Sequence, residues 1–209
     1  MILCGGLSTR LGMNKTDLQF KAQSFLERIA EEVSFVCSPI VLVGDVRFEQ
    51  HRLPKQAILA SDERPGNGPL EGIRVGLKRL ANQVDYAFVT SCDVPLIKSQ
   101  LISHLAELRG NQQAVIPHDG TRIYGMTAIY PTSLHEQIGQ RIERGQLRVS
   151  ELGEICSAQN PHTHSFREID PHLHSITNIN SAKDYRALLK QHGLECPPEI
   201  DAKLNEFRK

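Results

Sequence analysis

The stretch Tyr86-Ala87-Phe88-Val89-Thr90-Ser91-Cys92-Asp93 decides the fold of this chain. Its first five residues are aromatic, apolar or β-branched, which is the pattern of a strand buried on both faces of a sheet. Apolar residues recur at helical spacing on both sides of this strand, in residues 70–80 before it and in residues 97–108 after it. A strand flanked by two helices predicts βαβ units and a mostly parallel sheet.

The same alternation continues outward from this strand. It predicts a helix over residues 24–33 and further strands at 40–43, 57–60, 114–116 and 126–130. In the second half, the pattern predicts a helix over residues 134–142, a polar, histidine-rich surface excursion over 157–171 and a strand over 175–180. Ser181 is typical of a helix N-cap, with Asp184 at the third helical position, and predicts a helix running to about Gln191.

The 209 residues fit one domain, which we place at residues 1–192, followed by a C-terminal tail over 193–209 with a short helix. Lysine plus arginine and aspartate plus glutamate number 24 each, so no broad charged surface indicates nucleic acid or membrane as a partner. We find no apolar run long enough to span a bilayer and no signal peptide. The five cysteines are odd in number and form no C-x-x-C pair, so we expect a reducing, cytoplasmic setting.

The loop over residues 5–15, Gly5-Gly6-Leu7-Ser8-Thr9-Arg10-Leu11-Gly12-Met13-Asn14-Lys15, follows the first apolar residues of the chain. Glycines allow a backbone to approach a phosphate closely, and consecutive N–H groups can then bind the anion. Arg10 and Lys15 add positive charge where a triphosphate needs it. A P-loop is excluded because Gly12 and Lys15 are separated by two residues. The alternative is a glycine turn that carries two surface cations.

Two carboxylates follow predicted strands, Asp62 after residues 57–60 and Asp93 after the central strand. At the carboxyl end of a parallel strand, Asp93 can hold Mg²⁺, which takes few protein ligands and keeps most of its waters. The alternative for Asp93 is a cap on the following helix. Gly68-Pro69 is expected to open a helix, since proline tolerates the first helical position.

Other polar patterns are weaker. Asn178 and Asn180 are two apart, so in a strand both amides would reach one ligand, although a simple cap of the next helix is equally compatible. The pairs His162 with His164 and His172 with His174 lack the further ligands of a tetrahedral metal site. No Gly-x-Ser-x-Gly elbow is present, so nothing supports a serine hydrolase.

These motifs occur in an order that resembles the MobA-like nucleotidyltransferases over roughly residues 1–190. The motifs are Leu3-Cys4-Gly5-Gly6-x-Ser-x-Arg10-Leu11-Gly12-x-x-Lys15, Gly68-Pro69-Leu70-x-Gly72, Cys92-Asp93-x-Pro95 and Asn178-x-Asn180. The resemblance implies a Rossmann-like, three-layer αβα fold of the nucleotide-diphospho-sugar transferase type with a mostly parallel sheet. It also implies an enzyme that joins GMP from GTP to molybdopterin with Mg²⁺ and releases pyrophosphate.

The resemblance also implies roles for individual residues. The nucleotide would lie against Leu3, Cys4, Gly5 and Gly6, with Lys15 on the phosphates, Asp62 on the nucleoside and Asp93 on the metal. Arg10 would join Lys15 in stabilising the charge of the leaving pyrophosphate, Asp93 would act through the metal, and Asn178 and Asn180 would lie on the acceptor side. Relatives that use CTP tend to have Leu-Ala-Ala-Gly at residues 3–6, so the glycines here favour guanine.

Two departures leave alternatives open. Relatives have several residues before the opening motif, whereas Leu3 follows Met1 by two, so either the start codon was placed late or the first strand is a stub. Residues 122–126 replace a loop that often contains proline near the acceptor. The alternatives are a sibling transferase that uses CTP or another phosphorylated acceptor, and a nucleotide-binding module without catalysis. The partners expected are GTP, molybdopterin and, transiently, proteins of molybdoenzyme maturation, whereas the oligomeric state is left open.

Overall fold

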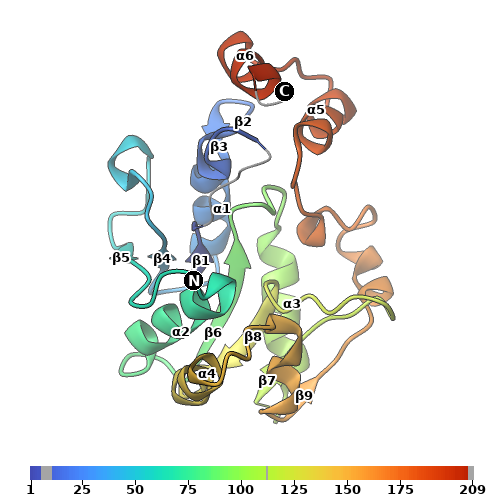
Figure 1. Cartoon of the computed structure of the whole chain (residues 1–209). Coiled ribbons are helices and arrows are strands. Elements are labelled where there is room, and N and C mark those ends of the chain that lie inside the picture. The colour runs from blue at the N-terminus through green and yellow to red at the C-terminus, as the bar shows by residue number, and fades with distance from the viewer. Residues whose placement is uncertain (6–10, 112, 207–209) are drawn as a thin grey trace.

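The computed structural model describes residues 1–5, 11–111 and 113–206, and a seven-stranded sheet lies at its centre (Figure 1). The strand order is β5-β4-β1-β6-β8-β7-β9. In that order the strands are Ile58–Ala60, Val41–Val43, Ile2–Leu3, Tyr86–Ser91, Ala128–Pro131, Ala114–Val115 and Ala158–Gln159.

The first four strands of this order are parallel. β1 pairs with β4 on one side and β6 on the other, and β4 pairs with β5. β8 runs antiparallel to β6 and β7, and β7 is parallel to β9. β1 is short, but hydrogen bonds from Thr90 N to Met1 O (3.1 Å) and from Cys4 N to Val43 O (2.7 Å) extend its pairing at both ends. The carboxyl ends of four parallel strands therefore meet at one edge of the sheet.

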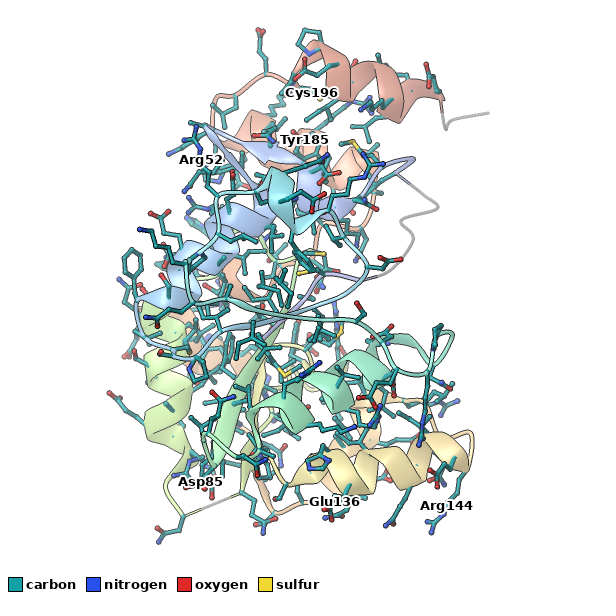
Figure 2. All side chains as sticks on the ribbon, turned by 90° about the vertical axis from the view of Figure 1, so that its left-hand side faces the viewer. Arg52, Asp85, Glu136, Arg144, Tyr185 and Cys196 are labelled. Carbon is teal, nitrogen blue, oxygen red and sulfur yellow. The ribbon has the colours of Figure 1, made fainter. Side chains whose placement is uncertain are left out.

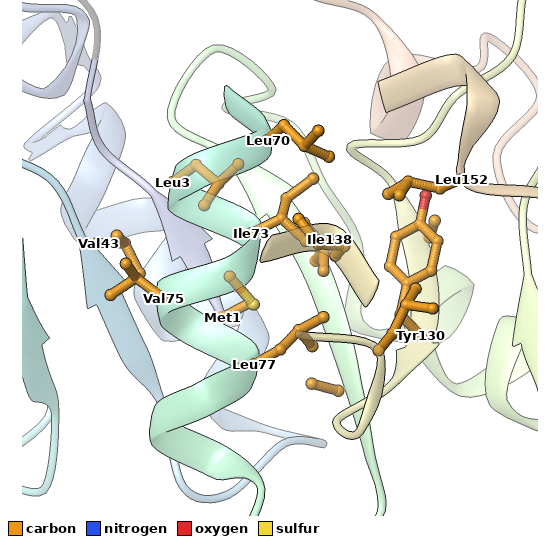
Figure 3. Packing of buried hydrophobic residues seen from close by; sticks show 14 of the residues in the cluster. Met1, Leu3, Val43, Leu70, Ile73, Val75, Leu77, Tyr130, Ile138 and Leu152 are labelled. Carbon is orange, nitrogen blue, oxygen red and sulfur yellow. The ribbon is translucent and has the colours of Figure 1, made fainter. Parts of the chain in front are cut away.

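Helices cover both faces of the sheet and complete the predicted three-layer arrangement. α2 (Gly68–Leu80) and α4 (Leu134–Glu143) pack on one face, and α1 (Phe25–Ser34) and α3 (Ser99–Arg109) pack on the other. The two residues of β1 point to opposite faces of the sheet. Leu3 belongs to the hydrophobic core under α2 and α4, and Ile2 belongs to the core under α1 and α3. Figure 3 shows Leu3 of β1 against α2, with Ile73 of α2 on the side of the helix that faces Ile138 of α4.

Local signals set the ends of these helices. Pro69 stands in the first turn of α2, where its missing N–H costs no hydrogen bond. A capping box between Ser24 and Glu27 starts α1, and a second one between Ser181 and Asp184 starts α5 (Ala182–Gln191) as the sequence predicts.

A third hydrophobic cluster lies beyond the carboxyl end of the sheet. It joins the hairpin β2–β3 (Gln19–Phe20 and Gln23–Ser24) to α5 and to α6 (Pro198–Glu206), the helix expected in the tail. Figure 2 shows Tyr185 and Cys196 of this region at one end of the molecule and Asp85 and Glu136 at the other. The chain after the sheet thus returns to cover residues near its beginning.

Two predictions for the second half are wrong. Residues 157–171 are not a surface excursion throughout, since they contain edge strand β9 and a 3-10 helix, Thr163–Glu168, whose Phe166 is fully buried. Residues 175–180 form no strand; a 3-10 turn, His174–Ile176, is followed by Ile179, whose N–H donates to the backbone oxygen of Asp93 (2.7 Å). In both segments, contacts with distant residues override the local pattern.

No helix in the described ranges is long and apolar enough to cross a membrane. All five cysteines are free.

Candidate nucleotide site

A cavity of about 710 Å³ opens at the carboxyl ends of the parallel strands. Its lining includes seven of the residues singled out from the sequence: Leu3, Cys4, Gly5, Lys15, Asp62, Asp93 and Asn180. The glycines of the α2 entry, Gly66, Gly68 and Gly72, line it as well. Gly6 and Arg10 lie outside the described residues. The parallel topology explains this convergence, since loops that follow neighbouring parallel strands meet at one edge.

Lys15, Asp93 and Asn180 form one hydrogen-bonded set on the β6 side of the cavity. The Lys15 ammonium donates to Oδ2 of Asp93 (3.2 Å) and to Oδ1 of Asn180 (2.7 Å). The Ser91 hydroxyl donates to the other carboxylate oxygen of Asp93 (2.5 Å). Three segments that are far apart in the sequence therefore place a cation, a carboxylate and an amide together.

Asp93 does not cap α3. The residue before this helix is Lys98, and no side chain caps it. Asp93 is instead 8% exposed, and its backbone oxygen receives the N–H of Ile179, which brings Asn180 to Lys15. The structure thus rules out the helix-cap interpretation of this carboxylate.

Asp62 lies on the β5 side of the same cavity. Burial, and next the nearby Glu71 carboxylate, raise the pKa of Asp62, while the Arg74 guanidinium opposes the shift. Glu71 is fully buried and accepts two hydrogen bonds from Arg74 (2.7 and 2.8 Å) and one from the backbone N–H of Arg64 (3.0 Å). A buried ion pair on α2 therefore fixes the loop that carries Asp62.

Two glycines give the cavity its shape, and one of them escaped the sequence analysis. Gly44 follows β4 with φ +151°, and a Cβ there would lie 2.6 Å from Gly5 N and 2.8 Å from the carbonyl carbon of Cys4. A Cβ at Gly72 would lie 3.2 Å from Leu3 and 3.8 Å from the Asp62 carboxylate. The signal for Gly44 was its place after a buried strand beside the opening motif, which the sequence analysis left unused.

The two thiols that line the cavity are neutral. Burial raises the pKa of Cys92 to about 12, and the neighbouring Asp93 carboxylate adds to the shift. Burial also raises the pKa of Cys4 well above its usual range. Because a thiolate is the reactive form of cysteine, neither residue is prepared to act as a nucleophile.

The donor set at Asp93 fits a magnesium ion. No group of three or more histidine, cysteine, aspartate or glutamate side chains that could hold a metal occurs in the described part of the chain. Mg²⁺ needs no such group, since it is commonly held by one or two carboxylates, its own waters and substrate phosphates. The Lys15 ammonium on Oδ2 shows that this carboxylate already attracts a cation.

Asn178 does not share the contacts of Asn180. Its Oδ1 accepts a hydrogen bond from Arg122 (2.9 Å), and it lines a second cavity of about 220 Å³. Pro69 and Met126 line both this cavity and the cavity of about 710 Å³, which we call the nucleotide cavity, so the two cavities adjoin. The second cavity is lined by Pro69, Arg122, Ile123, Tyr124, Gly125, Met126, Thr127, Leu147, Val149, Ser150 and Asn178.

Comparison with known proteins agrees with this geometry. The MobA-like NTP transferase domain matches residues 1–159. A probable molybdenum cofactor guanylyltransferase of Methanosarcina acetivorans is 30% identical over 203 residues, covering 90% of this chain and 88% of that protein. A molybdenum cofactor guanylyltransferase of Desulfosudis oleivorans is 26% identical and covers 88% of this chain and 90% of its own. The chain belongs to the MobA-like NTP transferase family.

A solved structure extends the agreement to the fold. The molybdopterin-guanine dinucleotide biosynthesis protein A of Archaeoglobus fulgidus has a TM-score of 0.76 at 22% identity, covering 92% of this chain and 97% of its own. The two proteins therefore share a fold. The family match and the similar guanylyltransferases show that this protein is a nucleotidyltransferase.

Proposed function

We propose that this enzyme transfers GMP from GTP to the phosphate of molybdopterin, forming the guanine dinucleotide and releasing pyrophosphate. One observation carries the proposal: Lys15, Asp93 and Asn180 meet in a glycine-lined cavity that also contains Asp62. The cavity supplies a phosphate-binding side and a nucleoside-binding side. The names of the similar proteins support GTP as donor and molybdopterin as acceptor.

The transfer is a displacement at the α-phosphorus of GTP. An oxygen of the acceptor phosphate forms a new bond to this phosphorus, and the bond to the bridging oxygen breaks, so that pyrophosphate leaves with the electron pair. Such a reaction depends on in-line placement and charge neutralisation more than on covalent help from the protein. When bound at Asp93, Mg²⁺ neutralises charge on the phosphate oxygens.

The side chains divide the remaining work. Lys15 donates to the triphosphate and stabilises the charge that develops on pyrophosphate, with Arg10 as a second cation in our proposal. Asp62 accepts a hydrogen bond from the nucleoside, and Asn180 orients the acceptor phosphate beside Lys15. Leu3, Cys4, Gly5 and Gly6 offer backbone groups to the base, whose edge pairs with N–H and C=O groups.

Guanine is the base we expect, and Gly5 provides the test. Among the residues that the structure describes, a Cβ at Gly5 would meet only the Cα of Gly44 at 3.6 Å, an ordinary contact, so nothing in that part of the chain opposes alanine there. Any effect of Gly5→Ala on base choice therefore acts on the ligand. The lack of a Cβ leaves room for the second ring of a purine.

The experiment is a competition between GTP and CTP at equal concentration, with molybdopterin and Mg²⁺ and with the products identified by mass. We expect the guanine product in the majority and a smaller majority for Gly5→Ala. A majority of the cytosine product would overturn the base assignment and leave nucleotidyl transfer standing. Absence of any molybdopterin product with either nucleotide would overturn the acceptor.

A further inference from the structure

Arg122 lines the second cavity and has no carboxylate partner among the residues that the structure describes. One of its terminal nitrogens donates to Oδ1 of Asn178 (2.9 Å), and its guanidinium carbon lies 4.9 Å from the centre of the Tyr124 ring. Arg122 is exposed, whereas the buried Arg74 and the half-buried Arg186 each pair with a carboxylate. A guanidinium has five N–H donors in a fixed plane, so Arg122 keeps most of them for a ligand.

Asp119 holds Arg122 in this position. Its Oδ1 accepts the backbone N–H groups of Thr121 (2.9 Å) and Arg122 (2.7 Å), and its Oδ2 accepts the hydroxyl of Tyr124 (2.8 Å). These hydrogen bonds hold the pKa of Asp119 well below its usual range. The carboxylate also offsets the charge of Arg122 for distant anions, which favours short-range recognition of a neutral group over attraction of a second phosphate.

The second cavity also has apolar walls. Ile123 and Leu147 are large apolar residues with 46% and 37% of their surface exposed, and Met126 and Val149 lie beside them in the lining, which also includes the polar residues Thr127, Ser150 and Asn178. Apolar walls with a few polar groups, among them a planar guanidinium, fit a flat ring that has a hydrogen-bond acceptor on one edge. At Pro69 and Met126 the cavity meets the nucleotide cavity, where the acceptor phosphate reacts.

We propose that Arg122 is a specificity-determining residue that binds the carbonyl edge of the acceptor's pterin ring in the second cavity, an inference that rests on the proposed function. The pterin edge presents a carbonyl oxygen, the counterpart of O6 in guanine, with two lone pairs that can accept hydrogen bonds. The planar guanidinium of arginine can donate two N–H groups to this edge in a fixed geometry, which lysine cannot reproduce. The acceptor phosphate then lies beside Asn180 and Lys15.

The test compares Arg122→Gln and Arg122→Lys with Arg79→Gln, a control on the exposed surface of α2. The first measurement is the affinity of 6-hydroxymethylpterin, followed by its fluorescence, in saturating GTP that keeps the probe out of the nucleotide cavity. The second is the KM for molybdopterin and for GTP in the transfer reaction. We expect both Arg122 variants to weaken pterin binding and raise the molybdopterin KM about tenfold or more, from the loss of one bidentate pair. In both Arg122 variants, the GTP KM and the kcat should stay within about twofold of the wild-type values. In the Arg79→Gln control, the pterin affinity and all kinetic constants should stay within the same range, because Arg79 lies outside the second cavity.

The outcomes separate this inference from the proposed function. Unchanged pterin affinity in Arg122→Gln, or full activity in Arg122→Lys, would overturn the inference even if the wild-type enzyme makes the guanine dinucleotide. No transfer to molybdopterin by the wild type would overturn the proposed function, whereas pterin binding that depends on Arg122 would still support the second cavity as a pterin site.

Discussion

Both carboxylate oxygens of Asp93 have a partner in the free enzyme, the Ser91 hydroxyl on Oδ1 and the Lys15 ammonium on Oδ2. The ammonium therefore holds the position from which a divalent cation would be bound. In the function proposed above, a nucleotide that enters with its metal would require Lys15 to exchange Asp93 for phosphate oxygens. Charge at Asp93, and not only its shape, should then decide activity.

Asp93→Asn tests this at the residue scale. The amide preserves the size of the side chain and can still accept from Ser91, so we expect a melting temperature close to that of the wild type. Transfer should fall by about 100-fold or more, the scale seen when one preorganised charge-stabilising group is lost. Pyrophosphate release with GTP, molybdopterin and Mg²⁺ is the measurement. Asp85→Asn, at the opposite end of β6 (Figure 2), is the matched control, and equal activity of the two variants would refute a role for Asp93 in the reaction.

At the scale of the element, two charged side chains of α2, Glu71 and Arg74, hold the loop that contains Asp62. Glu71 and Arg74 are one turn apart and buried, and Arg74 also reaches Glu63 in the loop (2.7 Å). Glu71→Gln leaves the buried guanidinium without its main partner, so we expect the free energy of unfolding to fall by about 3 kcal/mol. GTP affinity should fall with it, because the backbone of Arg64 loses its charged acceptor.

Glu63→Gln is the matched control. Glu63 also pairs with Arg74, but the Glu63 side chain is half exposed. An exposed ion pair contributes about 1 kcal/mol or less, so this variant should be only slightly less stable than the wild type. Urea unfolding gives the stabilities, and calorimetry gives the dissociation constant of GTP. Equal losses in the two variants would contradict a special role for the buried pair.

The elements also show how far the sequence predicts the structure. Regular apolar stripes place α1, α2, α4 and α5 within about two residues of their observed ends, and strand-end positions lead to Lys15, Asp62 and Asp93. Phe166 was missed because it is one of few apolar residues in a polar segment, and its burial depends on packing against distant helices. The close approach of Gly44 to Gly5 and the contact of Arg122 with Asn178 each join segments that are far apart in the sequence, so neither contact could be predicted from it.

At the scale of the whole molecule, the C-terminal tail packs against the segment that carries Lys15. Ile200 and Leu204 of α6 are buried in the third cluster with Leu11 and Leu18, which lie on either side of Lys15 in the sequence. α5 adds a hydrogen bond from the hydroxyl of Tyr185 to the backbone oxygen of Gln19 (2.7 Å). Because the two ends of the chain share this cluster, we propose that the tail braces the phosphate-binding segment of a domain that spans residues 1–192.

Removal of residues 193–209 should therefore leave a folded protein that melts earlier and binds GTP more weakly. The double variant Ile200→Ala with Leu204→Ala keeps the tail but removes its buried side chains, and we expect it to lose about 2 kcal/mol or more of stability. Glu199→Gln, on the exposed side of α6, should change stability by less than about 0.5 kcal/mol. Circular dichroism gives the melting temperatures, and calorimetry gives GTP affinity. If the truncated protein binds GTP as tightly as the full chain, the tail contributes nothing to the nucleotide site. If the truncated protein does not fold at all, the tail is part of the domain and does not merely follow it.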